Sequence, residues 1–370
     1  MTANEGEETI VSDGNTNDTG VTPAPNKKLP APTIALWVVV AVVAVGLPFQ
    51  LAPFRVDQMS SWLTLAIAAM GLNLLTGYNG QISVGHGALY GLGAYTAGLL
   101  VAKANVPLLV AVLAAGAVCF VAGVVIGLPA LRIKGLYLAL VTLAVATLFP
   151  LAVEQFSSLT GGNQGLEIRT EQMYRGSMRP RPVKFASPFE GLANDQWKYL
   201  VFLAVTAVCF LLTRNLIKSR IGRAMVAIRD NETAAAVSGI PVARTKIYTF
   251  GVGSALAGIA GGLMALNLGT IYPSSFTISV SIYFLVAVVI GGSATIAGPI
   301  IGALIYGAFN DVLIPELPNQ LQPASAVILG GLLIVQVLIA PGGVVGSFKL
   351  AGSKLALRKA RAAVDNSAAV

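Results

Sequence analysis

Seven long stretches of this sequence contain no Asp, Glu, Lys or Arg. They are residues 29–54, 59–102, 104–131, 135–153, 199–213, 247–310 and 317–348. A helix needs about 20 mainly apolar residues to cross a hydrocarbon core of roughly 30 Å, so these stretches have room for about eight to ten crossings. The pattern does not show the alternating strands of an outer-membrane barrel. It therefore predicts an all-α, polytopic integral membrane protein.

The composition supports the same class. Only 11% of the 370 residues are charged, against roughly 25% in soluble domains. The two cysteines, Cys119 and Cys209, lie inside apolar stretches, where a thiol behaves as a small apolar side chain. We therefore expect no disulfide framework and no metal site. We also expect no cofactor bound by this chain and no nucleic-acid partner.

The basic residues predict the orientation. The predicted spans are 33–53, 59–76, 82–102, 106–128, 135–153, 198–213, 245–268, a broken segment 280–314, and 323–341. Alternating crossings place Lys27, Lys28, Arg132, Lys134, the loop 214–246 and the C-terminal tail on one side. That side carries sixteen of the 24 Lys and Arg residues. By the positive-inside rule it is cytoplasmic, and so are both termini of this cell-membrane protein.

Three regions follow from this pattern: a disordered cytoplasmic tail over residues 1–30, a transmembrane domain over 31–345 and a basic cytoplasmic tail over 346–370. The first tail is rich in Gly, Asn, Thr and Pro, and so has little apolar surface to bury. One crossing separates the basic loop 157–197 from the more basic loop 214–246, so the loop 157–197 must face outside. This exception to the charge rule is acceptable because longer loops translocate with less regard to charge.

Two glycine-rich segments are candidates for a translocation path. Residues 280–314 are too long for one crossing and are interrupted around Pro299, which favours a re-entrant hairpin or two half-helices that begin and end outside. Residues 77–94 are also rich in glycine, which suggests two related halves. The candidate path residues are Asn73, Gln81, Ser83, His86, Gly291, Gly292, Ser293, Thr295, Gly298 and Pro299.

Simpler interpretations of both segments stay open. The break near Pro299 is also typical of a kinked helix or of tight glycine packing in a membrane bundle. His86, the single histidine, is also consistent with a residue at a helix start that bonds to backbone or faces water.

The sequence contains no energy source of its own. It lacks the GxxxxGK[ST] loop that cradles nucleotide phosphates. The carboxylates Asp57, Glu154, Asp311 and Glu316 lie at the ends of predicted spans or in loops, whereas proton-coupled transporters place carboxylates within the membrane. A partner protein is therefore the expected energy source.

The cytoplasmic loop 214–246 is the candidate contact for that partner. Asp230 or Asn231 is suited to cap a short helix, and Glu232 favours its positive end. Gly239 and Pro241 are suited to end it. The body of this two-turn helix has small side chains, which allow close seating in a cleft of another protein. The alternative is a solvated connecting loop.

Several segments resemble, in the expected order over roughly residues 55–345, the LivM type of branched-chain amino acid ABC transporter permease. They include 71–77 (GLNLLTG), 80–88 (GQISVGHGA), 131–139 (LRIKGLYLA), 222–232 (GRAMVAIRDNE), 290–295 (IGGSAT) and 340–343 (APGG). The outer loop 157–197 is more basic than we expect for this family.

The resemblance implies a permease that translocates branched-chain amino acids or related small polar solutes and is not itself an enzyme. It implies a LivH-like second permease, two ATP-binding subunits that bind the ATP, and an extracytoplasmic solute-binding protein that usually selects the solute. The implied ATPase-coupling residues, which follow a Glu-Ala-Ala and later Gly pattern, are Arg223, Arg229, Glu232, Ala234, Ala235 and Gly239.

Two other classes of function stay open from the residues alone. An ATP-independent secondary transporter or channel explains the broken helices equally well. An enzyme acting within the membrane is the weaker alternative, because the sequence has no paired carboxylates, no HExxH and no nucleophile beside a base.

Overall fold

The computed structural model describes residues 39, 42–131, 136–174, 177–182, 187–318, 320, 324–339 and 342–347. The predicted tail 1–30, the start of the predicted span 33–53, the residues Arg132 and Lys134, and the tail beyond residue 347 lie outside the described residues. The chain divides into one unit that ends at Leu47 and a larger unit, Pro48–Val370. In the first unit, residues 42–46 are helical.

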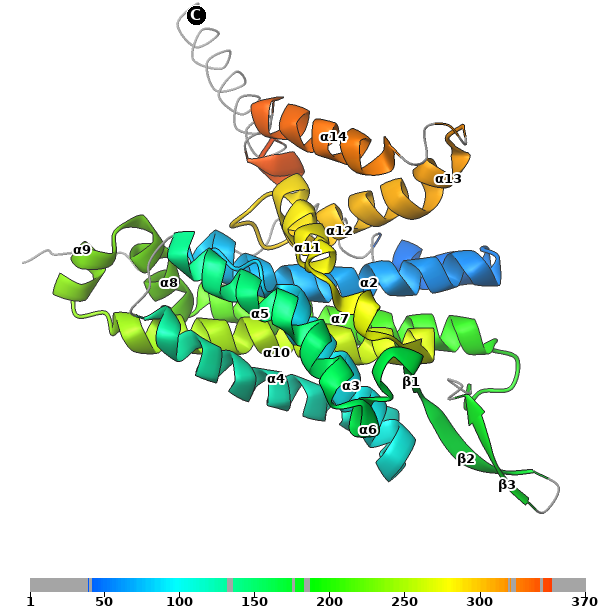
Figure 1. Cartoon of the computed structure of the whole chain (residues 1–370). Coiled ribbons are helices and arrows are strands. Elements are labelled where there is room, and N and C mark those ends of the chain that lie inside the picture. Colours follow the sequence, from blue (N-terminus) through cyan, green and yellow to red (C-terminus); the bar gives the residue numbers. More distant parts are fainter. Residues whose placement is uncertain are drawn as a thin grey trace, which may run out of the picture. The chain divides into compact units, whose positions relative to one another are not determined.

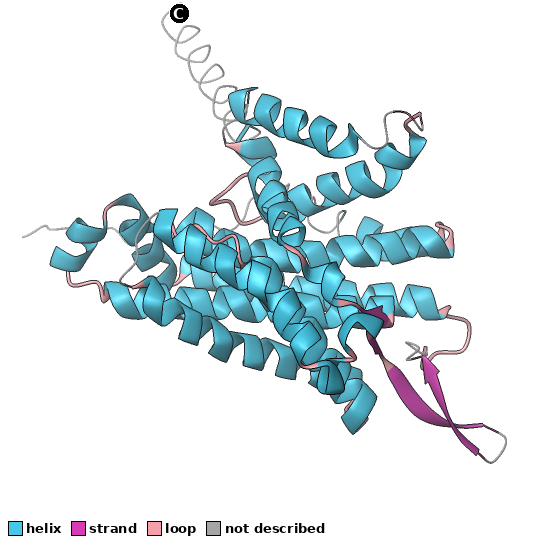
Figure 2. Cartoon of the chain, viewed as in Figure 1, coloured by secondary structure: helices cyan, strands magenta, loops and turns pink. Residues whose placement is uncertain are grey.

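Helices make up most of the described chain (Figures 1 and 2). The long helices are α2 (Pro53–Asn73), α3 (His86–Ala104), α4 (Leu108–Ala130), α5 (Leu136–Gln155), α7 (Asn194–Lys218), α8 (Arg220–Asp230), α10 (Val242–Leu268), α11 (Ile278–Gly291), α12 (Gly298–Ala308) and α14 (Ser325–Ile339). The shorter ones are η1 (Leu47–Phe49), η2 (Leu74–Tyr78), α6 (Ser157–Thr160), η3 (Gly162–Gln164), α9 (Glu232–Val237), η4 (Pro273–Phe276), η5 (Phe309–Leu313) and α13 (Ile314–Glu316).

Seven helical stretches in the described part of the chain are long and apolar enough to cross a membrane. They are Pro53–Tyr78, Leu108–Pro129, Tyr137–Gln155, Asn194–Lys218, Val242–Leu268, Pro273–Gly291 and Gly298–Glu316. Helices α3 and α14 lie where two further spans were predicted. The prediction of an all-α polytopic membrane protein is confirmed.

The broken segment 280–314 consists of two helices joined by residues 292–297. They form an antiparallel pair, because Gly291 lies beside Gly298 and Gly302 lies beside Ala287. Each of the two stretches, with its short flanking helices, has the length of a candidate span. The segment is thus a helical hairpin that is interrupted where the sequence predicts the break.

Helix α10 packs against α2, α3 and α4. It runs antiparallel to α2, since Gly253 lies beside Gly71 while Met264 lies beside Thr64. A Cβ atom at Gly253 would lie 2.9 Å from the Gly71 carbonyl oxygen, so glycine is what allows the two backbones to approach. In a membrane, apolar burial does not drive helices together, and such close backbone packing takes its place.

The segment 157–197, predicted only as a loop, contains strands. Strand β1 (Leu166–Glu167) pairs antiparallel with β4 (Thr270–Ile271), and β2 (Arg169–Tyr174) pairs antiparallel with β3 (Ser177–Pro182). Two prolines in β3 argue against a strand in the sequence, but proline is tolerated on an edge strand. The β2–β3 hairpin lies at the opposite end of the helices from α8 and α9 (Figure 1).

Candidate functional site

A short helix, α9, lies where the sequence predicts the contact with an ATPase. The Asn231 side chain caps it by accepting a hydrogen bond from the Ala234 N–H at 2.9 Å. Of the two candidate caps, Asp230 instead ends the preceding helix α8. Gly239 has a φ of +80°, a left-handed conformation that favours glycine after a helix end.

The two sides of α9 differ in exposure. Ala235 is buried, whereas Ala234, Ala236 and Gly239 are exposed. Val237 is 86% exposed, which is unusual for a branched apolar side chain. Val237 was not among the predicted site residues, although an apolar side chain in this cytoplasmic loop was a signal. The exposed side of α9 therefore carries small side chains and one valine.

Glu232 joins α9 to the N-terminal part of α10. Its carboxylate accepts from the Lys246 ammonium at 2.9 Å, and the Lys246 side chain is only 10% exposed. A buried ammonium without a carboxylate is strongly unfavourable, so each partner holds the other in place. Glu232 was among the predicted site residues, but Lys246 was not.

Arg229 joins α8 to the end of α2. Its guanidinium donates to the Gly77 carbonyl oxygen at 2.9 Å and to the Asp230 carboxylate at 2.9 and 3.0 Å. Gly80 also lies against the Arg229 side chain. Arg223 is exposed and donates to the Lys218 carbonyl oxygen at 3.3 Å, so it makes no comparable link within the described residues.

Asn73, which lies just before the glycine-rich segment 77–94, bonds to the break in the segment 280–314. Its side-chain NH₂ donates to the Thr295 carbonyl oxygen at 2.9 Å, and its side-chain oxygen accepts from the Ala294 N–H at 3.0 Å. Thr295 in turn donates from its hydroxyl to the Gly292 carbonyl oxygen at 2.7 Å. Because the loop 292–297 leaves backbone groups without helical partners, a single buried amide satisfies two of them.

The backbone at this contact is strained. Ala294 has a φ of +56°, which is uncommon for a residue with a Cβ atom. The adjoining end of α2 is the π-helical turn η2, a rare structure that is frequent at functional sites. Strained backbone persists where the surrounding contacts hold it, and the Asn73 hydrogen bonds are such contacts.

We expect the Asn73→Ala substitution to lower the free energy of unfolding by about 2–4 kcal/mol, because it leaves two buried backbone groups without partners. Thermal unfolding of the purified chain in detergent measures this. The matched control is Asn163→Ala, which removes an exposed amide and should change stability little. Equal unfolding temperatures for the two variants would contradict the bridging role of Asn73.

The other predicted path residues in this segment are buried. Gln81, Ser83 and His86 are 4%, 2% and 0% exposed. The Gln81 side chain accepts from the Asn79 NH₂ at 2.8 Å. The Ser83 hydroxyl makes no hydrogen bond to any described residue. The non-helical backbone before α3 is satisfied in part by Thr142, whose hydroxyl accepts from the Val84 N–H at 3.0 Å.

His86 begins α3, as one of the two interpretations expected, but it does not face water. Its ring lies edge-on to Phe284, with centroids 6.3 Å apart. The Ala68 backbone carbonyl lies near the imidazole ring. Neither ring nitrogen makes a well-formed hydrogen bond within the described part of the chain. A cavity of about 350 Å³ lies nearer the other end of α2, and none of the predicted path residues lines it.

Comparison with known proteins identifies the family of this chain. The family described as "Branched-chain amino acid transport system / permease component" matches residues 55–338. The chain belongs to this family. The match includes every predicted site residue, from Asn73 to Pro299.

The permease is similar to two curated LivM proteins, each described as a high-affinity branched-chain amino acid transport system permease protein. It is 30% identical to that of Salmonella typhimurium over 312 residues, which are 82% of this chain and 72% of the relative. It is 30% identical to that of Escherichia coli K12 over 316 residues, 83% and 73% of the two chains. The resemblance to LivM proteins is confirmed.

A LivH protein of Escherichia coli K12, described as a permease of the same kind of system, is also similar. The identity is 28% over 307 residues, which are 79% of this chain and 96% of the relative. No solved structure matches the permease. It is thus a multi-pass membrane protein of the branched-chain amino acid permease family.

Proposed function

We propose that this permease is a transmembrane subunit of an ABC importer for branched-chain amino acids. Two partner subunits bind and hydrolyse ATP on the cytoplasmic side, where both termini lie. A LivH-like second permease completes the membrane part, and an extracytoplasmic binding protein delivers the amino acid. The family membership and the likeness to both LivM and LivH proteins support this assembly.

The observation that carries the proposal is that α9 is exposed on one side and bonded to the rest of the protein on the other. Its small exposed side, with Ala234 and Val237, is free to seat in a cleft of an ATPase. Its other side is tied to α10 through the pair of Glu232 and Lys246. A helix that is exposed on one side and bonded to α10 on the other is suited to transmit a movement of a partner subunit to the membrane helices.

The contacts of Arg229 and Asn73 extend this link to the break between α11 and α12. Movement of α8 and α9 displaces the Gly77 carbonyl through Arg229. Gly77 lies one turn beyond Asn73 and directly against Ala294 in the break. ATP-driven closure of the partner subunits therefore repositions residues 292–297, which contribute to the translocation path with Gln81 and Ser83.

We propose that the β2–β3 hairpin contacts the binding protein. It lies at the end of the helices opposite to α8 and α9 (Figure 1). An importer needs its binding-protein contact and its ATPase contact at opposite ends, and the placement of these two elements agrees with that requirement.

Uptake of radiolabelled L-leucine into proteoliposomes tests the proposal against an ATP-independent transporter or channel. We expect uptake only when the second permease, the ATPase subunits, the binding protein and ATP are all present. The control uses a catalytically inactive ATPase subunit in the same assembly. Uptake by this chain alone, driven by an ion gradient, would establish the secondary transporter instead.

A further inference from the structure

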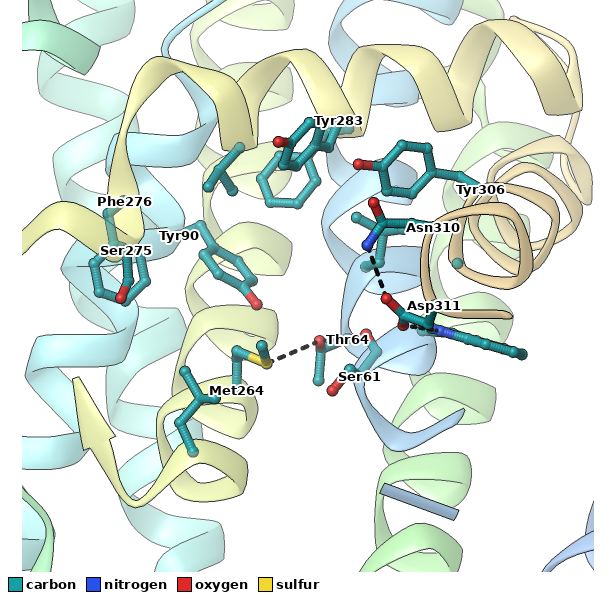
Figure 3. A pocket seen from close by; sticks show the side chains of 16 residues that line it. Ser61, Thr64, Tyr90, Met264, Ser275, Phe276, Tyr283, Tyr306, Asn310 and Asp311 are labelled. Carbon is teal, nitrogen blue, oxygen red and sulfur yellow. Dashed lines mark hydrogen bonds between the residues drawn. The ribbon is translucent and has the colours of Figure 1, made fainter. Parts of the chain in front are cut away.

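A partly open cavity of about 350 Å³ is lined by residues of α2, α3, α10, α11 and α12 and their short extensions (Figure 3). Its volume is at the low end of the roughly 300–1,000 Å³ that is usual for small-molecule sites. One wall is aromatic: the Tyr90 ring lies 5.2 Å from that of Phe284 and 6.0 Å from that of Phe276. The cavity therefore suits a small ligand with an apolar body.

Asp311 contributes the one carboxylate in the lining. Asp311 was expected at the end of a span, and it lies five residues before the end of the candidate span Gly298–Glu316, on the π-helical turn η5. Its two oxygens accept from the Trp62 indole N–H at 2.7 Å and from the Asn310 NH₂ at 2.8 Å. Both donors are neutral, so they orient the carboxylate and leave its charge uncompensated.

The described residues place no Lys or Arg in an ion pair with Asp311. Arg55 is linked to it only indirectly, because Arg55 donates to Gln58 at 3.0 Å and Gln58 donates to the Asp311 backbone carbonyl at 3.2 Å. An ionisable residue within a membrane-spanning segment is a candidate functional site by default, and the natural partner of a carboxylate there is a cation.

The position of the carboxylate is built into the packing of α2 on α12. A Cβ atom at Gly307 would overlap the Trp62 ring, so glycine there allows the indole to lie against α12 and reach Asp311. The rings of Tyr283 and Tyr306 lie beside this group with centroids 5.2 Å apart (Figure 3). Aromatic faces attract cations, which adds to the attraction of the carboxylate.

We propose that this cavity binds a primary ammonium group carried on a small apolar body, with Asp311 as its counter-ion. An aliphatic amino acid passing through the permease has this chemistry, and this source rests on the proposed function. The ethanolamine headgroup of a membrane lipid has the same ammonium. The cavity lies nearer the end of α2 away from Arg229, where an importer receives its substrate.

Binding of tritiated L-leucine, measured by a scintillation proximity assay, tests the proposal. The full-length chain, with any subunits that copurify, is placed in phosphatidylglycerol nanodiscs without ATP or binding protein. The competitors are isopentylamine, which is leucine without its carboxylate, and 4-methylpentanoate, which is leucine without its ammonium. We expect isopentylamine to displace leucine and 4-methylpentanoate to leave it bound.

The Asp311→Asn variant should weaken binding about tenfold or more, because a hydrogen bond to a charged group becomes a neutral one. Asparagine keeps an oxygen for the Trp62 N–H, so the fold should persist, and gel filtration checks this. The matched control is Glu316→Gln, which removes an exposed carboxylate outside the cavity lining and should bind leucine as the unmodified chain does.

A second arm separates the two sources of ammonium. Nanodiscs that also contain phosphatidylethanolamine should leave leucine binding unchanged if the amino acid is the occupant. Loss of leucine binding in these discs, or copurification of this lipid with the unmodified chain but not with the Asp311→Asn variant, would identify the lipid as the occupant of the same ammonium site.

Three results would overturn the proposal: equal leucine binding by the unmodified chain and the Asp311→Asn variant, equal competition by isopentylamine and 4-methylpentanoate, or neither leucine nor the lipid retained by the folded chain. Since ATP and the binding protein are absent from this assay, such results would leave the ATP-driven importer to its own uptake test.

Discussion

Replacing Gly302 by alanine should prevent α11 from packing on α12, so that little folded protein accumulates. A methyl group at Gly302 would overlap the Ala287 carbonyl oxygen, which belongs to the backbone of the facing helix and has no alternative rotamer. Overpacking in an ordinary core costs about 1–3 kcal/mol. A clash with the backbone of the facing helix, which cannot rotate away, should cost as much as the upper end of this range or more. The yield of monodisperse protein in detergent and its unfolding temperature measure the effect.

Gly330→Ala is the matched control for this substitution. Gly330 is also a helical residue, in α14, but nothing lies within 4 Å of the place where its Cβ atom would be. Alanine is favoured over glycine inside a helix by about 0.5–1 kcal/mol, so this variant should be as stable as the unmodified chain or more so. If both variants behave alike, the close packing of α11 and α12 is wrong.

The Glu232→Lys substitution should reduce ATP-dependent leucine uptake by about tenfold or more, because it turns an attractive contact with a nearly buried ammonium into a repulsive one. The Lys246 side chain is only 10% exposed and cannot reach water fully without a movement of the N-terminal part of α10. Helix α9 should therefore leave its position. Copurification of the ATPase subunits and uptake into proteoliposomes measure the two consequences separately.

The double variant Glu232→Lys, Lys246→Glu distinguishes an internal tether from a direct contact with the partner. It restores opposite charges at the same two positions, so uptake should recover substantially if Glu232 acts through Lys246. An inactive double variant would assign Glu232 to the ATPase surface itself. Full activity of the single Glu232→Lys variant, with its ATPase subunits still bound, would show that α9 is not the coupling element.

Local signals in the sequence predicted the elements that lie along one stretch of chain. Charge-free stretches marked the helices, since an apolar run of sufficient length has few other structures available in a membrane. The glycines and proline at 291–299 marked the break, and Asp230 or Asn231 with Gly239 marked the ends of α9. Each of these signals acts through the conformation of the residues that carry it.

The strands β2 and β3 were not predicted, because local signals do not show which residues pair with one another. Their pairing depends on contacts across the hairpin, whereas the local composition, with two prolines in six residues of β3, indicated a loop. Lys246 was missed because its role depends on the position of Glu232 in space, fourteen residues earlier in the chain.

The sequence by itself determined the class of protein, most of its spans, the break near Pro299 and the short helix α9. Only the tertiary structure decided that Asn73 bonds to Ala294 and Thr295, more than 200 residues away, and that Asp311 faces a cavity. The physical reason is that helices in a lipid bilayer are apolar on all sides, so no period of apolar residues distinguishes the side that packs from the side that meets lipid. Backbone contact at glycines and a few buried polar groups make that distinction, and their partners become known only when the helices are placed together.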